Sequence, residues 1–436
     1  MTMSGIDRRS LMAASGALLA ANSAKAGTAK AGYSFPNDFL WGAATSGHQV
    51  EGNNVNSDMW LLEHLKVSPF KEPSRDADDH YHLFEQDIAM LAKLGLNSFR
   101  FSLEWARIEP ARGEFSAAEM NHYVQVSQAC LKHGVKPVLT YNHYAVPVWF
   151  AANGGFEKPE AVDLFARFCE YTTKAIGPYV AVAATFNEPQ LGVLLRWMLP
   201  GFVIAGMEQA MTDAAKLTAT PLFSSIQFGN LERMQPILIA AHHKAYEVIK
   251  SGPGDFPVGV TIALHDDQAV GDNSRRDEKR AQCYGPWLEA ARSCDFIGVQ
   301  NYSRARIDAK GTVHPDPGAE LNQNGEEFWP EALEASIRYA WEQTGKPVYV
   351  TENGVSIADD SRRVEFINRA VAGVANCLRD GLPVRSYIHW SLLDNFNWVS
   401  GYAKQIGLVA VDRTTQQRTL KPSAVRLGQI AKANRI

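Results

Sequence analysis

Residues 182–189 read Val-Ala-Ala-Thr-Phe-Asn-Glu-Pro, a short and largely apolar run that ends in polar residues. A continuous run of this kind, without alternating polar positions, is typical of a β-strand that is buried on both faces. Seven other segments have the same character, at residues 39–45, 98–103, 136–141, 258–264, 296–300, 348–351 and 385–390. The sequence therefore predicts eight buried strands, of which residues 182–186 form the fourth.

Segments with apolar residues at helical spacing lie between these strands. They are residues 77–94, 119–133, 159–175, 231–250, 330–343 and 362–379. Repeated alternation of buried strands and helices predicts an α/β fold, a single closed (β/α)8 barrel of the TIM type. A doubly wound open sheet is the alternative, but no Gly-rich phosphate-binding turn follows the first strand. Residues 201–229 and 266–284 are expected to be loop insertions between barrel elements.

The N-terminus has the features of a bacterial export signal. Arg8 and Arg9 precede a modest apolar region, and Ala24-Lys25-Ala26 forms a small-x-small cleavage site. Paired arginines in this context are typical of a twin-arginine signal, and the apolar region is too short for a stable membrane anchor. We expect residues 1–26 to be a signal peptide, 27–34 a short extension and 35–436 the barrel domain. The expected location is periplasmic or secreted, without membrane contact once the signal is removed.

Composition narrows the function classes. Hydrophobic residues make up 46% and charged residues 21% of the 436 residues, which excludes a disordered chain and a disulfide scaffold. The formal net charge is -4 without a basic stripe, so nucleic acid is not an expected partner. The five cysteines include no CxxC pair and are expected to be buried free thiols. Their spacing leaves open whether Cys283 and Cys294 form a disulfide.

Two glutamates stand where a barrel enzyme carries its catalytic groups. Glu188 follows the fourth predicted strand, and Glu352 follows the seventh. Catalytic residues of such barrels lie at the carboxyl ends of strands, so both carboxyl groups are expected at the barrel mouth. A carboxylate pair across a pocket suits glycoside hydrolysis, in which one group donates a proton and the other attacks the anomeric carbon or activates water.

The strings around these glutamates, TFNEP at 185–189 and TENG at 351–354, resemble the two catalytic signatures of glycoside hydrolase family one, the β-glucosidase family. The resemblance extends from Phe35 to Pro422. Other matching strings are FLWGAAT at 39–45, QVEG at 49–52, FRFS at 99–102, EWARI at 104–108, DFIG at 295–298 and WSLLDNF at 390–396. The chain is therefore identified as an exported member of this family.

The resemblance implies a retaining β-glycosidase that removes terminal β-linked sugars from oligosaccharides or from aryl and alkyl glycosides. Glu352 is implied as the nucleophile, and Glu188 as the acid that later acts as the base. Arg100 and Tyr302 are implied to flank Glu352 and keep it ionised. The implied sugar-binding residues are Gln49, His143, Asn187, Tyr302, Trp390, Asn397 and Trp398. The resemblance implies no cofactor and no metal.

The chain departs from the family pattern around the sugar pocket. Asn397 stands where members that prefer glucose carry a glutamate for the 4- and 6-hydroxyls. An amide there makes only neutral hydrogen bonds, one as donor and one as acceptor. The other departures are Gln300, Asn301 and Tyr144-Ala145. We expect a β-glucosidase with an altered glycone pocket, or alternatively an enzyme for fucosides, galactosides, xylosides or 6-substituted glucosides.

Three other classes fit the sequence less well. A phospho-glycosidase is not expected, because Ile406 replaces the tyrosine of that branch and phosphorylated sugars are cytoplasmic. A catalytically silent sugar-binding barrel is disfavoured because both glutamates are present. A metal-dependent barrel hydrolase is disfavoured because no HxH or HExxH pattern ends a strand, and His80 and His82 are expected on the solvated face of the first helix. The expected partner is a small-molecule carbohydrate or glycoside, and the oligomeric state stays open.

Overall fold

The eight predicted strands form a closed barrel of parallel strands in the computed structural model, which describes residues 32–436. They are β1 (Leu40–Ala44), β2 (Ser98–Ser102), β3 (Lys136–Asn142), β4 (Val182–Asn187), β5 (Val258–Ala263), β7 (Phe296–Asn301), β10 (Val348–Asn353) and β11 (Val384–Trp390). The last strand, β11, pairs with β1 and closes the barrel. The (β/α)8 barrel is thereby confirmed. The predicted signal peptide lies outside the described residues.

Several strands continue past the apolar runs that predict them. β4 ends at Asn187, β7 at Asn301 and β10 at Asn353, each beyond the last apolar residue. These polar residues still belong to the barrel, because Asn353 lies opposite Asn301 on one side and His389 on the other. As a consequence, Glu352 is a residue of β10 itself, whereas the sequence predicts it just after the strand.

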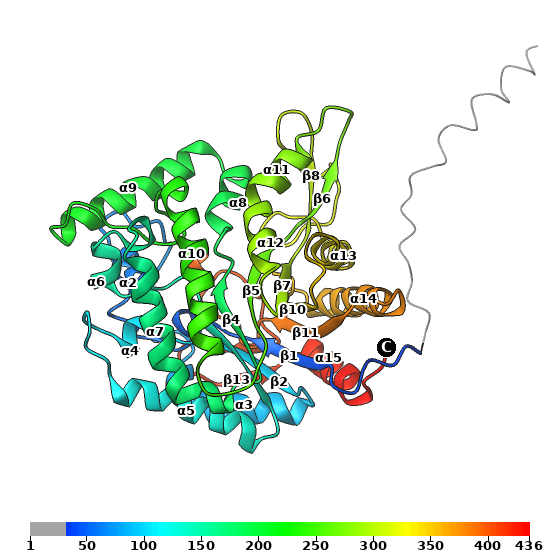
Figure 1. Cartoon of the computed structure of the whole chain (residues 1–436). Coiled ribbons are helices and arrows are strands. Elements are labelled where there is room, and N and C mark those ends of the chain that lie inside the picture. Colours follow the sequence, from blue (N-terminus) through cyan, green and yellow to red (C-terminus); the bar gives the residue numbers. More distant parts are fainter. Residues whose placement is uncertain (1–31) are drawn as a thin grey trace, which may run out of the picture.

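An outer layer of helices surrounds the barrel (Figure 1). Six long helices match the predicted ones: α3 (His80–Leu94), α5 (Ala117–Lys132), α7 (Ala161–Ile176), α10 (Leu231–Lys250), α13 (Ala332–Thr344) and α14 (Asp360–Arg379). Helices not predicted are α1 (Gly47–Val50), α2 (Asp58–Glu63), α4 (Trp105–Ile108), α6 (Val148–Ala152), α8 (Leu191–Met198), α12 (Gly285–Ala291) and α15 (Pro422–Ala433). Local signals fix some ends: Ser116 caps α5, Asn230 caps α10, and Gly95 ends α3 with a φ of 101°.

Both predicted insertions are present. Residues 201–229 contain α9 (Gly201–Leu217), which follows α8 (Leu191–Met198), and residues 266–284 contain β6 (Asp266–Ala269) and α11 (Arg276–Cys283). β6 pairs with β8 (Arg304–Ile307), which pairs with β9 (Thr312–Val313), and Figure 1 shows this part projecting beside α11. A separate hairpin joins β12 (Val409–Val411) to β13 (Arg418–Leu420). Both insertions follow the carboxyl ends of strands, so they border the mouth of the barrel.

One expected surface residue is buried. His80 lies at the start of α3, where Nδ1 is 2.8 Å from Oδ2 of Asp87, and the ring is covered. Arg418 of β13 also binds Asp87, so the C-terminal hairpin packs over this face of the helix and removes it from solvent. The prediction of a solvated face is therefore wrong for His80, although it is right for His82, which is exposed.

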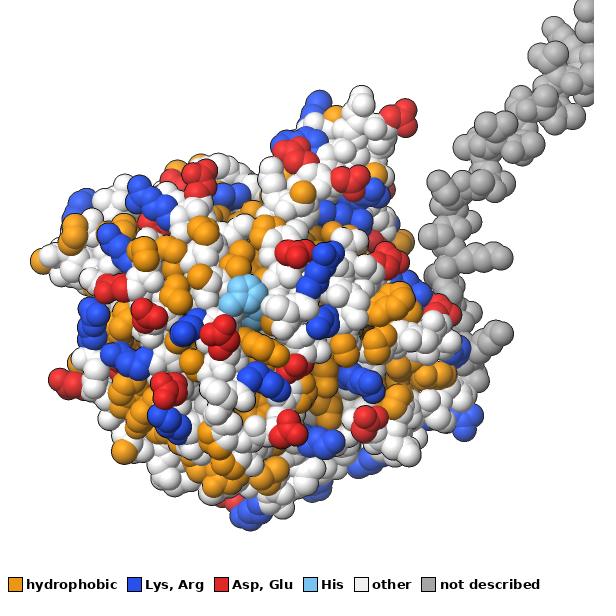
Figure 2. Space-filling view, in the orientation of Figure 1, with side chains coloured by type: hydrophobic (Ala, Val, Ile, Leu, Met, Phe, Trp, Pro, Cys, Tyr) orange, Lys and Arg blue, Asp and Glu red, His pale blue; other side chains and the backbone are white. Residues whose placement is uncertain are grey.

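The cysteines and the charged side chains can be compared with the predictions from composition. All five cysteines are buried and free within the described part of the chain, so Cys283 and Cys294 do not form a disulfide. No helix within residues 32–436 combines the length and the apolar character needed to cross a membrane. On the face shown in Figure 2, acidic and basic side chains of the described residues are interspersed, without a continuous basic area.

Candidate active site

The two glutamates are buried at the mouth of the barrel. Glu188 follows β4 and is 7% exposed, and Glu352 lies near the end of β10 and is 3% exposed. The backbone N–H of Glu188 donates to the carbonyl of Thr261 on β5 at 2.9 Å, which ties the residue to the neighbouring strand. Its φ of 39° is uncommon for a residue with a side chain, so the surrounding contacts hold it in a strained conformation.

Glu352 has a hydrogen-bond donor on each carboxylate oxygen. Nη1 of Arg100 on β2 lies 2.5 Å from Oε1, and the hydroxyl of Tyr302 donates to Oε2. Burial raises the pKa of Glu352 above its ordinary value, while the Arg100 charge and both hydrogen bonds act in the opposite direction. These contacts favour the ionised form, which a nucleophile requires.

Glu188 has a different environment. The hydroxyl of Tyr144 donates to its Oε2, and Arg100 acts on it only through its charge. Burial, followed by the negative charge of Glu352, raises the pKa of Glu188 to about 8. Glu188 is therefore largely protonated at neutral pH, so the site contains one carboxyl group suited to donate a proton beside one that is held for attack.

A network of side chains orients Asn187 between the glutamates. Its Oδ1 accepts hydrogen bonds from Nη2 of Arg100 at 2.6 Å and from Nε2 of Gln300 at 2.8 Å. Arg100 is held in turn by Oγ1 of Thr140, 3.1 Å from Nε. The carbonyl end of Asn187 is therefore occupied, and its NH2 end faces the Tyr144 phenol and the open mouth. Gln300, a departure from the family pattern, thus serves to position Asn187.

Three aromatic rings line the other side of the mouth. His143 stacks on Trp390 with ring centroids 5.5 Å apart and planes at 21°, and Trp398 lies parallel to His143 at 6.3 Å. Burial lowers the pKa of His143 well below its ordinary value, so the ring is neutral. No group within residues 32–436 hydrogen-bonds its buried Nδ1. A neutral imidazole beside two indoles provides the apolar face and the polar edge that a sugar ring requires.

Comparison with known proteins identifies the family. The model of glycosyl hydrolase family 1 matches residues 32–290 and 291–436. The chain belongs to glycosyl hydrolase family 1. β-Glucosidase A of Thermotoga maritima is 26% identical over 92% of this chain and 98% of its own, and a β-glucosidase from an Agrobacterium species is 27% identical over 89% and 93%.

Solved structures agree with this assignment. The apo structure of a β-glucosidase designated 1317 is 45% identical, with a TM-score of 0.89 over 91% of this chain and 98% of that chain. The β-glycosidase BGL167 is also 45% identical, with a TM-score of 0.88 over 92% and 98%. As a family 1 member the chain is an O-glycosyl hydrolase of the β-glucosidase type, and it acts on carbohydrate substrates.

Two predicted sugar-binding residues of this family 1 enzyme are already engaged by the protein. Gln49 donates through Nε2 to the carbonyl of Phe396 at 2.7 Å, and Oγ of Ser46 donates to its Oε1 at 2.7 Å. Asn397 donates through Nδ2 to the carbonyls of Asn395 at 3.0 Å and Lys404 at 3.2 Å. The expectation that Asn397 offers both a donor and an acceptor is therefore wrong, because only its Oδ1 is left.

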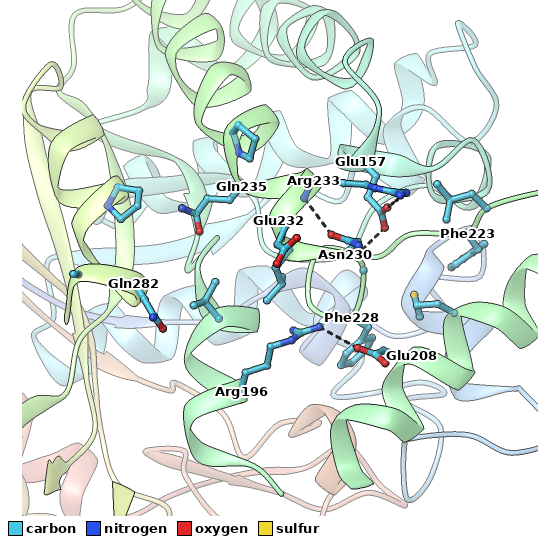
Figure 3. A pocket seen from close by; sticks show the side chains of 18 residues that line it. Glu157, Arg196, Glu208, Phe223, Phe228, Asn230, Glu232, Arg233, Gln235 and Gln282 are labelled. Carbon is cyan, nitrogen blue, oxygen red and sulfur yellow. Dashed lines mark hydrogen bonds and ion pairs between the residues drawn. The ribbon is translucent and has the colours of Figure 1, made fainter. Parts of the chain in front are cut away.

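A separate cavity of about 940 Å³ lies between α8, α9, α10 and α11 (Figure 3). The described residues that line it include neither Glu188 nor Glu352. Figure 3 shows its charges in pairs: Arg196 faces Glu208 at 3.5 Å, and Arg233 faces Glu157 at 3.7 Å. Glu232 also lines the cavity, and none of these charged groups contacts either glutamate of the barrel mouth. No cluster of three or more His, Cys, Asp or Glu side chains in residues 32–436 is arranged to hold a metal ion.

Contacts link Glu188, Glu352, Arg100, Asn187 and Tyr302 to one another, and His143, Trp390 and Trp398 form an aromatic group. Gln49 and Asn397 bind neighbouring parts of the protein. Sequence reasoning missed the contact between Tyr144 and Glu188, because it noted Tyr144 only as a departure from the family pattern. A signal was available, since this tyrosine follows His143 in the loop after β3. Its contact with Glu188 requires the backbone conformation of that loop, however, which the sequence does not show.

Proposed function

We propose that the protein is a retaining β-glycosidase in which Glu352 is the nucleophile and Glu188 is the acid and base. The observation that carries this proposal is the contrast between the two carboxyl groups. Arg100 and Tyr302 stabilise the charge of Glu352. Glu188, with a pKa of about 8, retains its proton at neutral pH. This is the division of roles that double displacement requires.

The reaction proceeds in two steps. An oxygen of Glu352 bonds to the anomeric carbon while the bond to the leaving oxygen breaks, and Glu188 transfers its proton to that oxygen. Glu188, now a carboxylate, takes a proton from water, whose oxygen displaces Glu352 from the anomeric carbon. Asn187 is expected to donate through its NH2 group to the 2-hydroxyl, a hydrogen bond that strengthens as positive charge develops on the sugar. The sugar leaves with its β configuration retained.

We propose further that the glycone is held without a charge on its 4- and 6-hydroxyl side. Asn397 offers one neutral acceptor there, because both of its N–H groups are bound by backbone carbonyls. Charge-assisted hydrogen bonds are about twice as strong as neutral ones, so this pocket discriminates weakly in favour of plain glucose. Glycones that lack or mask the 6-hydroxyl, such as fucosides, xylosides and 6-substituted glucosides, are the preferred substrates, with simple β-glucosides as weaker ones.

A panel of nitrophenyl β-glycosides tests both parts of the proposal. We expect hydrolysis of several β-glycosides, with kcat/KM for the fucoside or xyloside at least equal to that for the glucoside. Proton NMR during hydrolysis should show the β anomer first, followed by slow mutarotation. An α anomer as first product contradicts the retaining mechanism. A strong preference for unsubstituted glucoside contradicts the proposed glycone pocket but leaves the mechanism intact.

We also propose that residues 1–26 direct export by the twin-arginine route, on the basis of Arg8, Arg9 and the site at Ala26. In a bacterial host, the full chain should accumulate in the periplasm with an N-terminus near Gly27. A variant with both arginines replaced by lysine should remain in the cytoplasm with its signal uncut. Equal export of both chains contradicts this route.

A further inference from the structure

Tyr144 is fixed at the barrel mouth by the loop that follows β3. Its backbone N–H donates to Oδ1 of Asn142 at 3.2 Å, and Nδ2 of Asn142 donates to the carbonyl of Ala145 at 2.9 Å. Tyr144 has a φ of 69°, a left-handed conformation that costs energy in a residue with a side chain. The Asn142 bridges maintain this conformation, which directs the phenol to the hydroxyl–carboxyl contact with Glu188.

The Tyr144 ring is also held on both sides. It meets His143 edge to face with centroids 5.0 Å apart, and Trp398 edge to face at 5.4 Å. The residue is 2% exposed, so its hydroxyl has little access to water. Loss of the hydroxyl oxygen alone therefore leaves the ring packing in place, and the effect of such a change reports on the hydrogen bond to Glu188.

The direction of this hydrogen bond is set by charge. Burial, and then the negative charges of Glu188 and Glu352, raise the pKa of the Tyr144 phenol well above its ordinary value. The phenol therefore stays protonated and donates to Oε2 of Glu188. The carbonyl oxygen of a carboxylic acid is a better acceptor than its hydroxyl oxygen, so the donated bond at Oε2 favours the proton on Oε1.

We propose that Tyr144 is a positioning residue that holds Oε2 of Glu188, so that Oε1 carries the proton delivered to the leaving group. This inference rests on the proposed role of Glu188 as acid and base. In the second step the same bond stabilises the Glu188 carboxylate that takes a proton from water, because hydrogen bonds to an ionised group are stronger than those to a neutral one. Tyr144 thus acts in both steps without contacting the reacting carbon.

The pH dependence of kcat/KM in Tyr144→Phe distinguishes a positioning role of Tyr144 from a purely structural role. The ionisable and charged groups that face Glu188 are Tyr144 after β3, Arg100 on β2, Glu352 on β10 and Tyr302 after β7. Tyr144→Phe removes a donor to the ionised form, so the pKa of Glu188 rises from about 8. Because Glu188 must be protonated to act as the acid, the alkaline limb of kcat/KM should move to higher pH by about one unit.

The leaving group gives a second readout. We expect Tyr144→Phe to lose about tenfold in kcat/KM on a phenyl glycoside, whose leaving oxygen needs the proton, and no more than about threefold on a dinitrophenyl glycoside. Tyr141→Phe is the matched control, because this buried β3 tyrosine bonds Oγ1 of Thr173 at 2.6 Å, away from the glutamates. The control should keep the wild-type pH profile and leaving-group ratio. Equal losses on both substrates with an unmoved alkaline limb would overturn the role of Tyr144.

A titration that needs no turnover distinguishes failure of this inference from failure of the proposed function. Carbon-13 labelling of glutamate side-chain carboxyls allows Glu188 to be followed by NMR, with Glu188→Gln as the difference sample that assigns the signal. Tyr144→Phe should raise the titration midpoint of Glu188, and Tyr141→Phe should not. An unchanged midpoint overturns the inference, even if the enzyme proves to be a retaining glycosidase. A raised midpoint in a protein without glycosidase activity contradicts the proposed function and removes the catalytic meaning of the contact.

Discussion

Replacing Arg100 by methionine tests whether Glu352 is held as an ionised nucleophile. The side chains of this ion pair are 1% and 4% exposed, and the charged atoms lie 2.5 Å apart. Methionine has a similar length and no charge, so Arg100→Met removes the cation from Glu352 and one of the two strong donors from Asn187. Tyr302 remains as the only hydrogen-bond donor to the Glu352 carboxylate that the described residues provide.

The structure sets the size of the expected effect. Breaking a buried ion pair by removing one partner costs about 3–5 kcal/mol. Glu352 avoids part of this cost by retaining a proton, and 1.36 kcal/mol corresponds to one pH unit, so the acidic limb of kcat/KM should move upward by about two pH units. At pH 6 we expect kcat/KM on a nitrophenyl glycoside to fall by up to roughly 100-fold, the largest change in ionised fraction that a two-unit shift produces, because a protonated carboxyl group is not a nucleophile.

Arg100→Met should also change how the Tm of the protein depends on pH. A carboxyl group with a raised pKa in the folded state contributes stability below its unfolded pKa and loses it as pH rises through the folded value. The pKa of Glu352 is raised by burial, and Arg100→Met raises it further. The variant should therefore be close to wild type in Tm at pH 4 and fall behind it by roughly 5 °C at pH 8.

Arg363→Met is the matched control for this experiment. Arg363 of α14 is also buried and paired, with Asp360, and its other hydrogen bonds go to the carbonyls of Ile357 and Gln405, not to Glu188 or Glu352. It should lose stability without moving the acidic limb of kcat/KM. If Arg100→Met keeps the wild-type acidic limb and most of its activity at pH 6, the proposed ionisation of Glu352 by Arg100 is refuted.

Other substitutions address the remaining roles. Glu352→Gly should abolish hydrolysis and, with azide, form an α-glycosyl azide identified by NMR; a β product contradicts its role as nucleophile. Glu188→Ala should lose about 100-fold or more in kcat/KM on poor leaving groups and far less on dinitrophenyl glycosides, and equal losses contradict its role as acid. Asn397→Glu should raise the ratio of kcat/KM for glucoside over fucoside by about tenfold, since a carboxylate adds about 1–2 kcal/mol of binding there. The variant should also have a lower Tm, because a glutamate side chain cannot donate hydrogen bonds to the carbonyls of Asn395 and Lys404. If the wild type already prefers the glucoside and Asn397→Glu leaves the glucoside-to-fucoside ratio unchanged, residue 397 does not select the glycone.

The barrel could be predicted because its strands are buried on both faces, which leaves continuous apolar runs in the sequence. The ends of the strands could not be placed, because Asn187 and Asn353 are polar yet remain in the ladder. Their side chains find partners at the mouth, and only the assembled barrel supplies those partners. The burial of His80 was missed for a similar reason, since Arg418, which covers this site through Asp87, is more than 300 residues away in the sequence.

The proposed catalytic pair, Glu188 and Glu352, could be predicted from their position at strand ends. Their different environments could not, because these depend on contacts between strands that are distant in the sequence. Tyr144 is an example, because its reach to Glu188 depends on a left-handed backbone that Asn142 maintains. Asn397 is a second example: its NH2 group hydrogen-bonds nearby backbone carbonyls, and the sequence alone does not show which end of the amide is free.

Covalent trapping tests the retaining mechanism most directly. A dinitrophenyl 2-deoxy-2-fluoro-β-glycoside of the preferred glycone slows the second step more than the first, so the glycosyl-enzyme should accumulate. The mechanism predicts a burst of one dinitrophenolate per protein molecule and one added glycosyl group, which peptide mass spectrometry places on Glu352. A burst that is absent, or a label on Glu188 or any other residue, contradicts a double displacement with Glu352 as the nucleophile.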